Sequence, residues 1–283
     1  MAKTRKLFAT LTRRGPHRAL RGDLAFAGLP GVLYTPESGL GLPAVAFGHD
    51  WLVGPQRYRP LLEHLASWGI VAAAPATETS VLPSVLNLAA DLGRTLDVVT
   101  SVRIGTGAIS VDPGRLALAG HGFGASAAVF AAAGLQSAAH PPKAVGALYP
   151  KKTVPDAEGP AAGLRVPGLV LLSPQSSLSV HVHDAALAAQ WPGSTLRIVA
   201  KAKPARLVSG FRLASRVGLA RPDRRTQRNT RALLTGYLLY QLTGERKYAD
   251  FADADVRLPH TVAPDPDATP VELGDKIAAL LGR

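Results

Sequence analysis

Histidine and carboxylate side chains gather in a few short segments of this chain. They are His49, Asp50, His121, His181, His183 and Asp184. Imidazole and carboxylate groups can bind zinc, and three or four of them leave a coordination position open for water. The alternative, which we favour, is that the histidines are ordinary loop residues and that Asp184 caps a helix. We therefore expect neither a metal nor another cofactor.

Basic side chains dominate two segments, and the formal net charge is +12. No acidic residue precedes Asp23, and Asp223 is the single acid between residues 197 and 231. This asymmetry favours an anionic partner such as a membrane surface or nucleic acid. The alternative is a solvated basic face. No helix-turn-helix or RNA-binding signature accompanies these segments, which argues against nucleic acid.

Composition indicates a globular chain without cysteine chemistry. Of the 283 residues 47% are hydrophobic, which suffices for a buried core, and none is cysteine. The apolar run at 7–11 is too short for a secretory signal, and the apolar stretch at 232–242 is too short to span a bilayer. We expect a cytoplasmic protein and leave peripheral contact with a membrane open.

Apolar segments alternate with amphipathic segments along the chain. Strands are expected at 43–47, 70–74, 115–119, 143–148, 168–172 and 195–200, with a hairpin at 20–35 and a turn at 112–114. Helices are expected at 58–68, 82–104, 125–133, 184–190 and 224–242. This alternation predicts the α/β class, with a mainly parallel sheet covered by helices on both faces.

The site of such a sheet lies in the loops after the carboxyl ends of its strands. Those loops are expected at 48–54, 75–80, 120–124, 149–160, 173–184 and 201–212. We expect three parts in the chain: a flexible basic tail at 1–18, the α/β domain at 19–250 and a C-terminal extension at 251–283.

The segment at 115–130, RLALAGHGFGASAAVF, resembles the nucleophile elbow of the α/β-hydrolase superfamily. It is most similar to the dienelactone hydrolase and cutinase-like polyester hydrolase branch. The segment PAVAFGHDW at 43–51 resembles the oxyanion strand and loop of that branch, and residues 58–75 resemble its next helix and strand. The resemblance implies an α/β-hydrolase fold over about residues 20–245. For an enzyme, it implies carboxylic ester hydrolysis.

The catalytic triad that the resemblance implies is degenerate. The elbow should read G-x-S-x-G, but Gly122 stands where the serine belongs. Glycine keeps a sharp turn without strain and removes the nucleophile. The acid position falls near Ser176 and Ser177, and the histidine position falls near Arg206.

Ser126 is the alternative nucleophile, in a looser G-x-S-x-A pattern. It follows the end of the expected strand by too many residues for an elbow, so we favour a packing role.

The oxyanion hole, by contrast, needs only backbone N–H groups. The resemblance assigns these donors to Trp51 and Phe123, with Asp50 and His121 beside them. Asp50 replaces the second glycine of the usual loop, and we expect its charge to disfavour a bound oxyanion.

These observations favour a catalytically inactive α/β-hydrolase-like protein. It would bind a small acyl or ester-like ligand, or a protein partner, in the former active-site cleft. Two alternatives stay open. One is an active esterase that uses Ser126 or a metal at His181 and His183, and the other is a basic adaptor at anionic membranes or nucleic acid.

Overall fold

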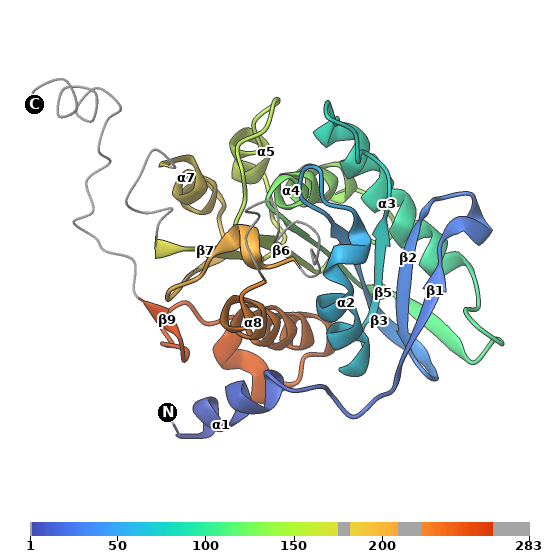
Figure 1. Cartoon of the computed structure of the whole chain (residues 1–283), viewed down its shortest axis with the longest axis horizontal. Helices are drawn as coiled ribbons and strands as arrows, with labels where there is room; N and C mark the ends of the chain where they lie inside the picture. Colours follow the sequence, from blue (N-terminus) through green and yellow to red (C-terminus); the bar gives the residue numbers. More distant parts are fainter. Residues whose placement is uncertain (1, 175–181, 209–221, 263–283) are drawn as a thin grey trace, which may run out of the picture.

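The computed structural model describes residues 2–174, 182–208 and 222–262 (Figure 1). In this part of the chain nine strands form one sheet: β1 (Ala19–Asp23), β2 (Gly31–Pro36), β3 (Gly39–Gly48), β4 (Val71–Pro75), β5 (Ile109–His121), β6 (Ala144–Leu148), β7 (Gly168–Leu172), β8 (Ser194–Val199) and β9 (Thr261–Val262). The α-helices with described bounds are α1 (Ala2–Leu11), α2 (Arg59–Ser67), α3 (Val85–Ser101), α4 (Phe123–Leu135), α5 (Glu158–Ala162), α7 (Val182–Gln190) and α8 (Arg224–Thr243). Short 3-10 turns include η2 (Pro55–Tyr58), η3 (Pro204–Arg206) and η5 (Arg246–Phe251).

The strands follow the order β1-β2-β4-β3-β5-β6-β7-β8-β9. The pairs from β4 through β8 are parallel, whereas β1, β2 and β9 join the edges in antiparallel pairs. The expected hairpin is present as β1 and β2. The prediction of an α/β fold with a mainly parallel sheet is therefore confirmed.

Helices cover both faces of this sheet (Figure 1). Side chains of α3, α4, α5 and α7 share one buried cluster with the sheet, and those of α1, α2 and α8 share the other. The strands are nearly continuous apolar runs because both of their faces are buried. Among the described residues, no helix combines the length and the apolar character that a membrane crossing requires.

Capping residues set the ends of the longest helix, α8. The Asp223 carboxylate accepts a hydrogen bond of 2.8 Å from the backbone N–H of Thr226, which satisfies a donor that the first turn leaves free. Gly244 ends the helix with a φ of +71°, a left-handed conformation that glycine adopts at little cost. For α7 the predicted cap is wrong, because the helix begins at Val182 and Asp184 lies inside it.

The prediction of a flexible tail at residues 1–18 is also wrong. Residues 2–11 form α1, in which Phe8 and Leu11 are buried. The Phe8 ring stacks on the Phe251 ring, with 6.4 Å between ring centroids. The apolar residues lie about one helical turn apart, so they reach the same face and dock against α8 and η5.

The expected boundary at residue 250 falls within the packed domain. Phe251 and Leu258 are buried in the same cluster as α8, and β9 pairs with β8. Residues 251–262 are thus part of the fold, while 263–283 lie outside the described residues.

The turn expected at 112–114 is a bulge within β5. Between the pairs Leu42–Val111 and Ala44–Leu116, β5 carries extra residues that β3 does not match. The Asp112 carboxylate accepts the Gly114 N–H at 2.8 Å, so the local turn chemistry is present without ending the strand.

Candidate functional site

A sharp turn joins the central strand β5 to α4 at Gly122. Its φ of +56° and ψ of −115° belong to a region that residues with a Cβ rarely adopt. The helix also packs very closely on the strand, since a Cβ on Gly120 would lie 2.0 Å from the Gly124 carbonyl oxygen. This strand–turn–helix geometry is what a nucleophile elbow requires.

The two N–H donors predicted for an oxyanion hole converge on one oxygen atom. Trp51 lies in the loop after β3, and Phe123 is the first residue of α4. Their backbone N–H groups donate to Oδ1 of Asp50 at 2.9 and 3.0 Å. The Asp50 carboxylate thus occupies the position on which both donors converge.

Asp50 also fills the space above Gly122. A Cβ on Gly122 would lie 2.2 Å from Oδ1 of Asp50 and 2.5 Å from its Cγ. A serine side chain therefore has no room while Asp50 keeps this position. The expectation that Asp50 disfavours an oxyanion stays a prediction.

Lys151 neutralises the buried carboxylate. Its Nζ lies 2.7 Å from Oδ2 of Asp50, and Asp50 is only 5% exposed, whereas the Lys151 side chain is 54% exposed. Burial alone would raise the pKa of Asp50. His121, Lys151 and the Phe123 N–H outweigh burial, so the pKa falls below its ordinary value. Asp50 is accordingly ionised at neutral pH.

Tyr58 and His121 complete the buried network. The Tyr58 hydroxyl accepts the Asp50 N–H at 3.0 Å and lies 2.8 Å from Nδ1 of His121. Burial lowers the pKa of His121 to about 4, although Asp50 opposes this change. His121 is therefore neutral at pH 7, and its Nδ1 accepts a hydrogen bond from the Tyr58 hydroxyl.

Of the acid and histidine positions that the resemblance implies, the structure describes only the histidine position. Ser176 and Ser177 lie outside the described residues. Arg206 lies in η3 after β8 and is partly buried. The sequence from 184 to 259 contains no histidine that could serve as a base beside Gly122.

Ser126 is a buried residue within α4. Its hydroxyl donates to the Lys151 carbonyl oxygen at 2.7 Å and so ties the helix to the loop that carries Lys151. This contact accounts for the serine by packing and hydrogen bonding.

Among the described residues, the histidines considered for a metal form no metal-binding group. Both ring nitrogens of His49 contact backbone carbonyl oxygens, at 2.7 Å from Thr77 and 3.0 Å from Asp50. His183 and Asp184 lie on α7, and His181 lies outside the described residues. Across the described ranges, no group of three or more potential ligands has metal-binding geometry.

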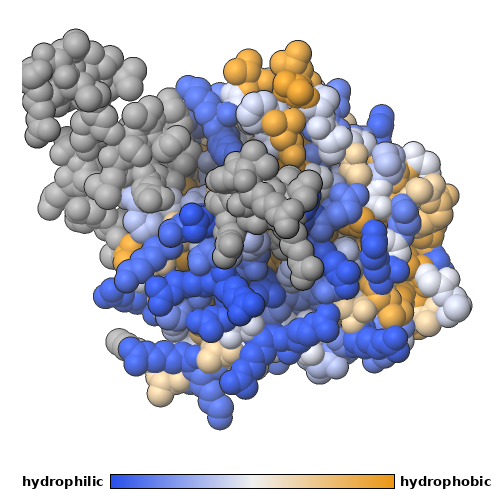
Figure 2. Space-filling model, viewed as in Figure 1, coloured by the Kyte–Doolittle hydropathy of each residue, from blue (hydrophilic) through white to orange (hydrophobic). Residues whose placement is uncertain are grey.

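Exposed apolar side chains lie in the loop after β3 and around the start of α3. We define the apolar rim as Trp51, Leu52, Val81, Leu82 and Leu86. Trp51 is 47% exposed and Leu82 is 90% exposed. The Trp51 indole donates to the Val81 carbonyl oxygen at 3.1 Å, which joins the two loops of the rim. In Figure 2, hydrophobic residues gather at the top of the view, over the ends of α3 and α5, while hydrophilic residues cover the side of α8.

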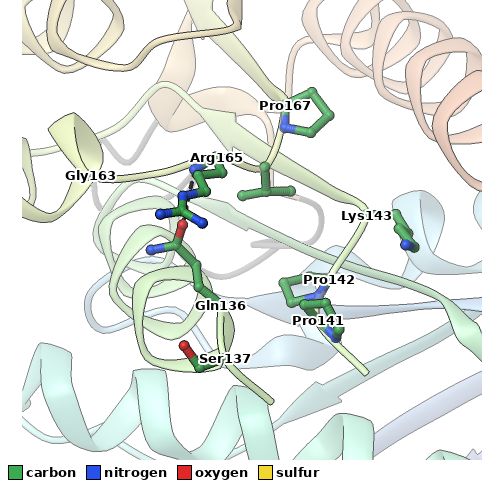
Figure 3. Close-up of a pocket in the computed structure, with 9 residues that line it drawn as sticks. Gln136, Ser137, Pro141, Pro142, Lys143, Gly163, Arg165 and Pro167 are labelled. Atoms are coloured by element: carbon green, nitrogen blue, oxygen red, sulfur yellow. Dashed lines mark hydrogen bonds between the residues drawn. The ribbon is translucent and has the colours of Figure 1, made fainter. Parts of the chain in front are cut away.

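A cavity of about 420 Å³ lies at the other end of the parallel strands, where β6 and β7 begin (Figure 3). Gln136 and Arg165 form one wall, and the backbone N–H of Arg165 donates to the Gln136 side-chain oxygen at 3.0 Å. Pro141, Pro142 and Lys143 form the other wall, before β6 begins. Because ligands of parallel sheets bind at the carboxyl ends of the strands, this cavity is not the counterpart of the elbow site.

The sequence-based interpretation missed Lys151 and Tyr58. Lys151 follows β6, the neighbour of the elbow strand, within a loop that was expected at the site edge. The signal that could have found it is a buried acid at 50, which requires a cation nearby.

Comparisons with known proteins do not identify this chain by sequence. Neither a scan against protein-family models nor a search of curated proteins finds a match. The site is therefore interpreted from its own geometry.

Proposed function

We propose that this protein is a non-catalytic member of the α/β-hydrolase superfamily, closest to the dienelactone hydrolase and polyester hydrolase branch. The elbow at Gly122, the converging donors of Trp51 and Phe123 and the mainly parallel sheet support this assignment.

One observation carries the proposal: the Asp50 carboxylate accepts hydrogen bonds from both N–H groups that the resemblance assigns to the oxyanion hole. Ester hydrolysis needs a nucleophile and N–H donors free to stabilise the developing negative charge. Here Gly122 supplies no nucleophile, and both donors already bind Asp50. The site is built to hold its own side chain in place of a reacting ester.

The apolar rim supports binding of an acyl ligand without turnover. Trp51 and Lys151 both contact the Asp50 carboxylate, so the rim begins directly beside an exposed ammonium group. An acyl chain would bury the exposed rim, and its carboxylate or ester end would lie near Lys151.

The first test is hydrolysis of p-nitrophenyl butyrate. We expect no turnover above background from the wild type, nor from a variant with Asp50→Gly and Gly122→Ser, since a serine without a base is a weak nucleophile. Ser126→Ala is the control. Wild-type turnover that Ser126→Ala abolishes would show an active esterase and would refute the proposal.

The second test measures binding of an acyl chain, with decanoate titrated against tryptophan fluorescence. We expect a saturable change that Trp51→Phe removes, because Trp51 is half exposed in the rim. Trp68→Phe is the matched control, since Trp68 bonds the Arg13 carbonyl oxygen far from the rim. An equal loss of signal in both variants, or no saturation, would contradict acyl binding here.

A further inference from the structure

A second cavity, of about 490 Å³, opens beyond the carboxyl end of β8. It lies between the loop that follows this strand and the first turn of α8. We define the basic pocket by its lining residues, Pro174, Lys201, Ala202, Lys203, Asp223 and Arg225.

A buried hydrogen-bond network fixes the two walls of the basic pocket. Thr226 is fully buried, and its hydroxyl accepts a hydrogen bond of 3.0 Å from the backbone N–H of Lys203. The same hydroxyl donates to the Asp223 carboxylate at 2.6 Å. Lys203 and the start of α8 are therefore held at a set spacing before any ligand arrives.

Lys201 is also fixed by its backbone. Its φ of +58° is a left-handed conformation that a lysine adopts at a cost. On either side of Lys201, the Ala200 N–H donates to the backbone carbonyl oxygen of His260, and the Ala202 N–H donates to that of Val199. Lys201 and the two residues that follow it line the cavity.

Positive charge exceeds negative charge among the described residues of the basic pocket, because three cations line it beside one acid. Within the described ranges Lys201, Lys203 and Arg225 form no ion pair. The one acid, Asp223, already accepts the Thr226 N–H and hydroxyl as the helix cap. Burial raises its pKa, but these hydrogen bonds and Lys203 outweigh burial, so the pKa lies below its ordinary value.

We propose that the basic pocket binds the dianionic phosphate group of a phosphate monoester. Three cationic side chains supply charge-assisted donors, and the volume leaves room for a small organic group attached to the phosphate. A concave pocket favours such a ligand over a nucleic-acid backbone, which contacts an extended surface. This site is separate from the elbow and does not depend on the function proposed for it.

The test is a calorimetric titration of the full chain with inorganic phosphate and with glycerol 3-phosphate, at constant ionic strength. We expect one saturable site, weakened roughly tenfold for each cation removed in Lys203→Gln and Arg225→Gln. The matched control is Lys143→Gln with Arg165→Gln, which removes the same charge from the cavity of Figure 3.

Two results would overturn the site. Equal weakening in the control pair would show a general effect of net charge. Tighter binding of a short DNA duplex, lost evenly over many basic residues, would show a polyelectrolyte surface.

His260 offers an independent readout by NMR. Burial lowers its pKa, and Arg228 and Arg225 lower it further. Bound phosphate should therefore raise the pKa of His260 in the wild type and change it little in Arg225→Gln. An unchanged pKa at saturating phosphate would place the ligand elsewhere.

Vesicles distinguish the two sources of the phosphate group. Co-sedimentation with phosphatidylcholine vesicles that contain phosphatidic acid, lost in the Lys203→Gln and Arg225→Gln pair, would identify a lipid headgroup. Binding of glycerol 3-phosphate without co-sedimentation would identify a free phosphorylated metabolite. Failure of both ligands to bind would refute the proposal.

Discussion

Gly122→Ala is expected to lower the free energy of unfolding by on the order of 4 kcal/mol. A Cβ at this φ costs about 1–3 kcal/mol in backbone strain. The added Cβ would also lie 2.2 Å from the Asp50 carboxylate. The carboxylate would therefore have to move away from the Trp51 and Phe123 donors. Losing these contacts costs roughly 1–3 kcal/mol more for each group left without a partner. Urea unfolding measures the sum.

A double-mutant cycle isolates the collision with Asp50. In Asp50→Gly with Gly122→Ala, we expect the loss to be smaller than the sum of the single losses by about 2 kcal/mol. Gly134→Ala is the matched control, because it lies on the same helix and its added Cβ meets nothing within 4 Å. Additive losses, or a Gly122→Ala cost no larger than that of Gly134→Ala, would contradict the close fit.

Stability is expected to fall steeply as the pH drops from about 6.5 to about 4. His121 is buried, and its folded-state pKa of about 4 lies below the ordinary value of 6.5. In this interval the unfolded chain binds a proton that the folded chain does not. The contribution of neutral His121 to the free energy of unfolding is fully present above pH 6.5 and is lost as the pH falls to about 4. This contribution amounts to about 3 kcal/mol. Burial and Arg231 lower the pKa of His64 to about 3, which adds to the loss in the same direction.

Asp50 extends this loss to lower pH. Its pKa lies below 3.8, so its contribution is present above that value and disappears as the pH falls through the folded-state pKa. Urea unfolding at several pH values measures the slope. In His121→Gln the slope between pH 6.5 and 4 should decrease by about one proton. An unchanged slope would show that His121 is not neutral in the folded protein.

The strands and helices were largely predictable because their signals are local. Six apolar runs marked the parallel strands, and the strand predicted at 168–172 matches β7 residue for residue. Asp112, Pro113 and Gly114 predict a turn but form a bulge, because these residue types favour both and only the pairing with β3 distinguishes them. Likewise, the many basic residues at the N-terminus predict a tail, whereas the apolar side chains of Phe8 and Leu11 lie on one face of α1 and are buried.

The site was predictable in its backbone but not in its side chains. Local motifs placed Gly122, Trp51 and Phe123 on the elbow and the loop after β3. The Asp50–Lys151 contact joins residues that lie 101 positions apart, and it depends on the order of β3, β5 and β6 in the sheet. No sequence motif encodes such a distance.

The carboxylate of Asp50 has the chemical form of the acid that ester hydrolysis releases. Bound to the Trp51 and Phe123 N–H groups, it is a carboxylate that the backbone tethers beside its donors. A dissolved carboxylate competes by its concentration, whereas a group fixed to the backbone beside its donors is present at an effective concentration far higher. Both N–H groups are therefore permanently occupied by a side chain of the protein itself, and no ordinary amount of a dissolved carboxylate would displace it.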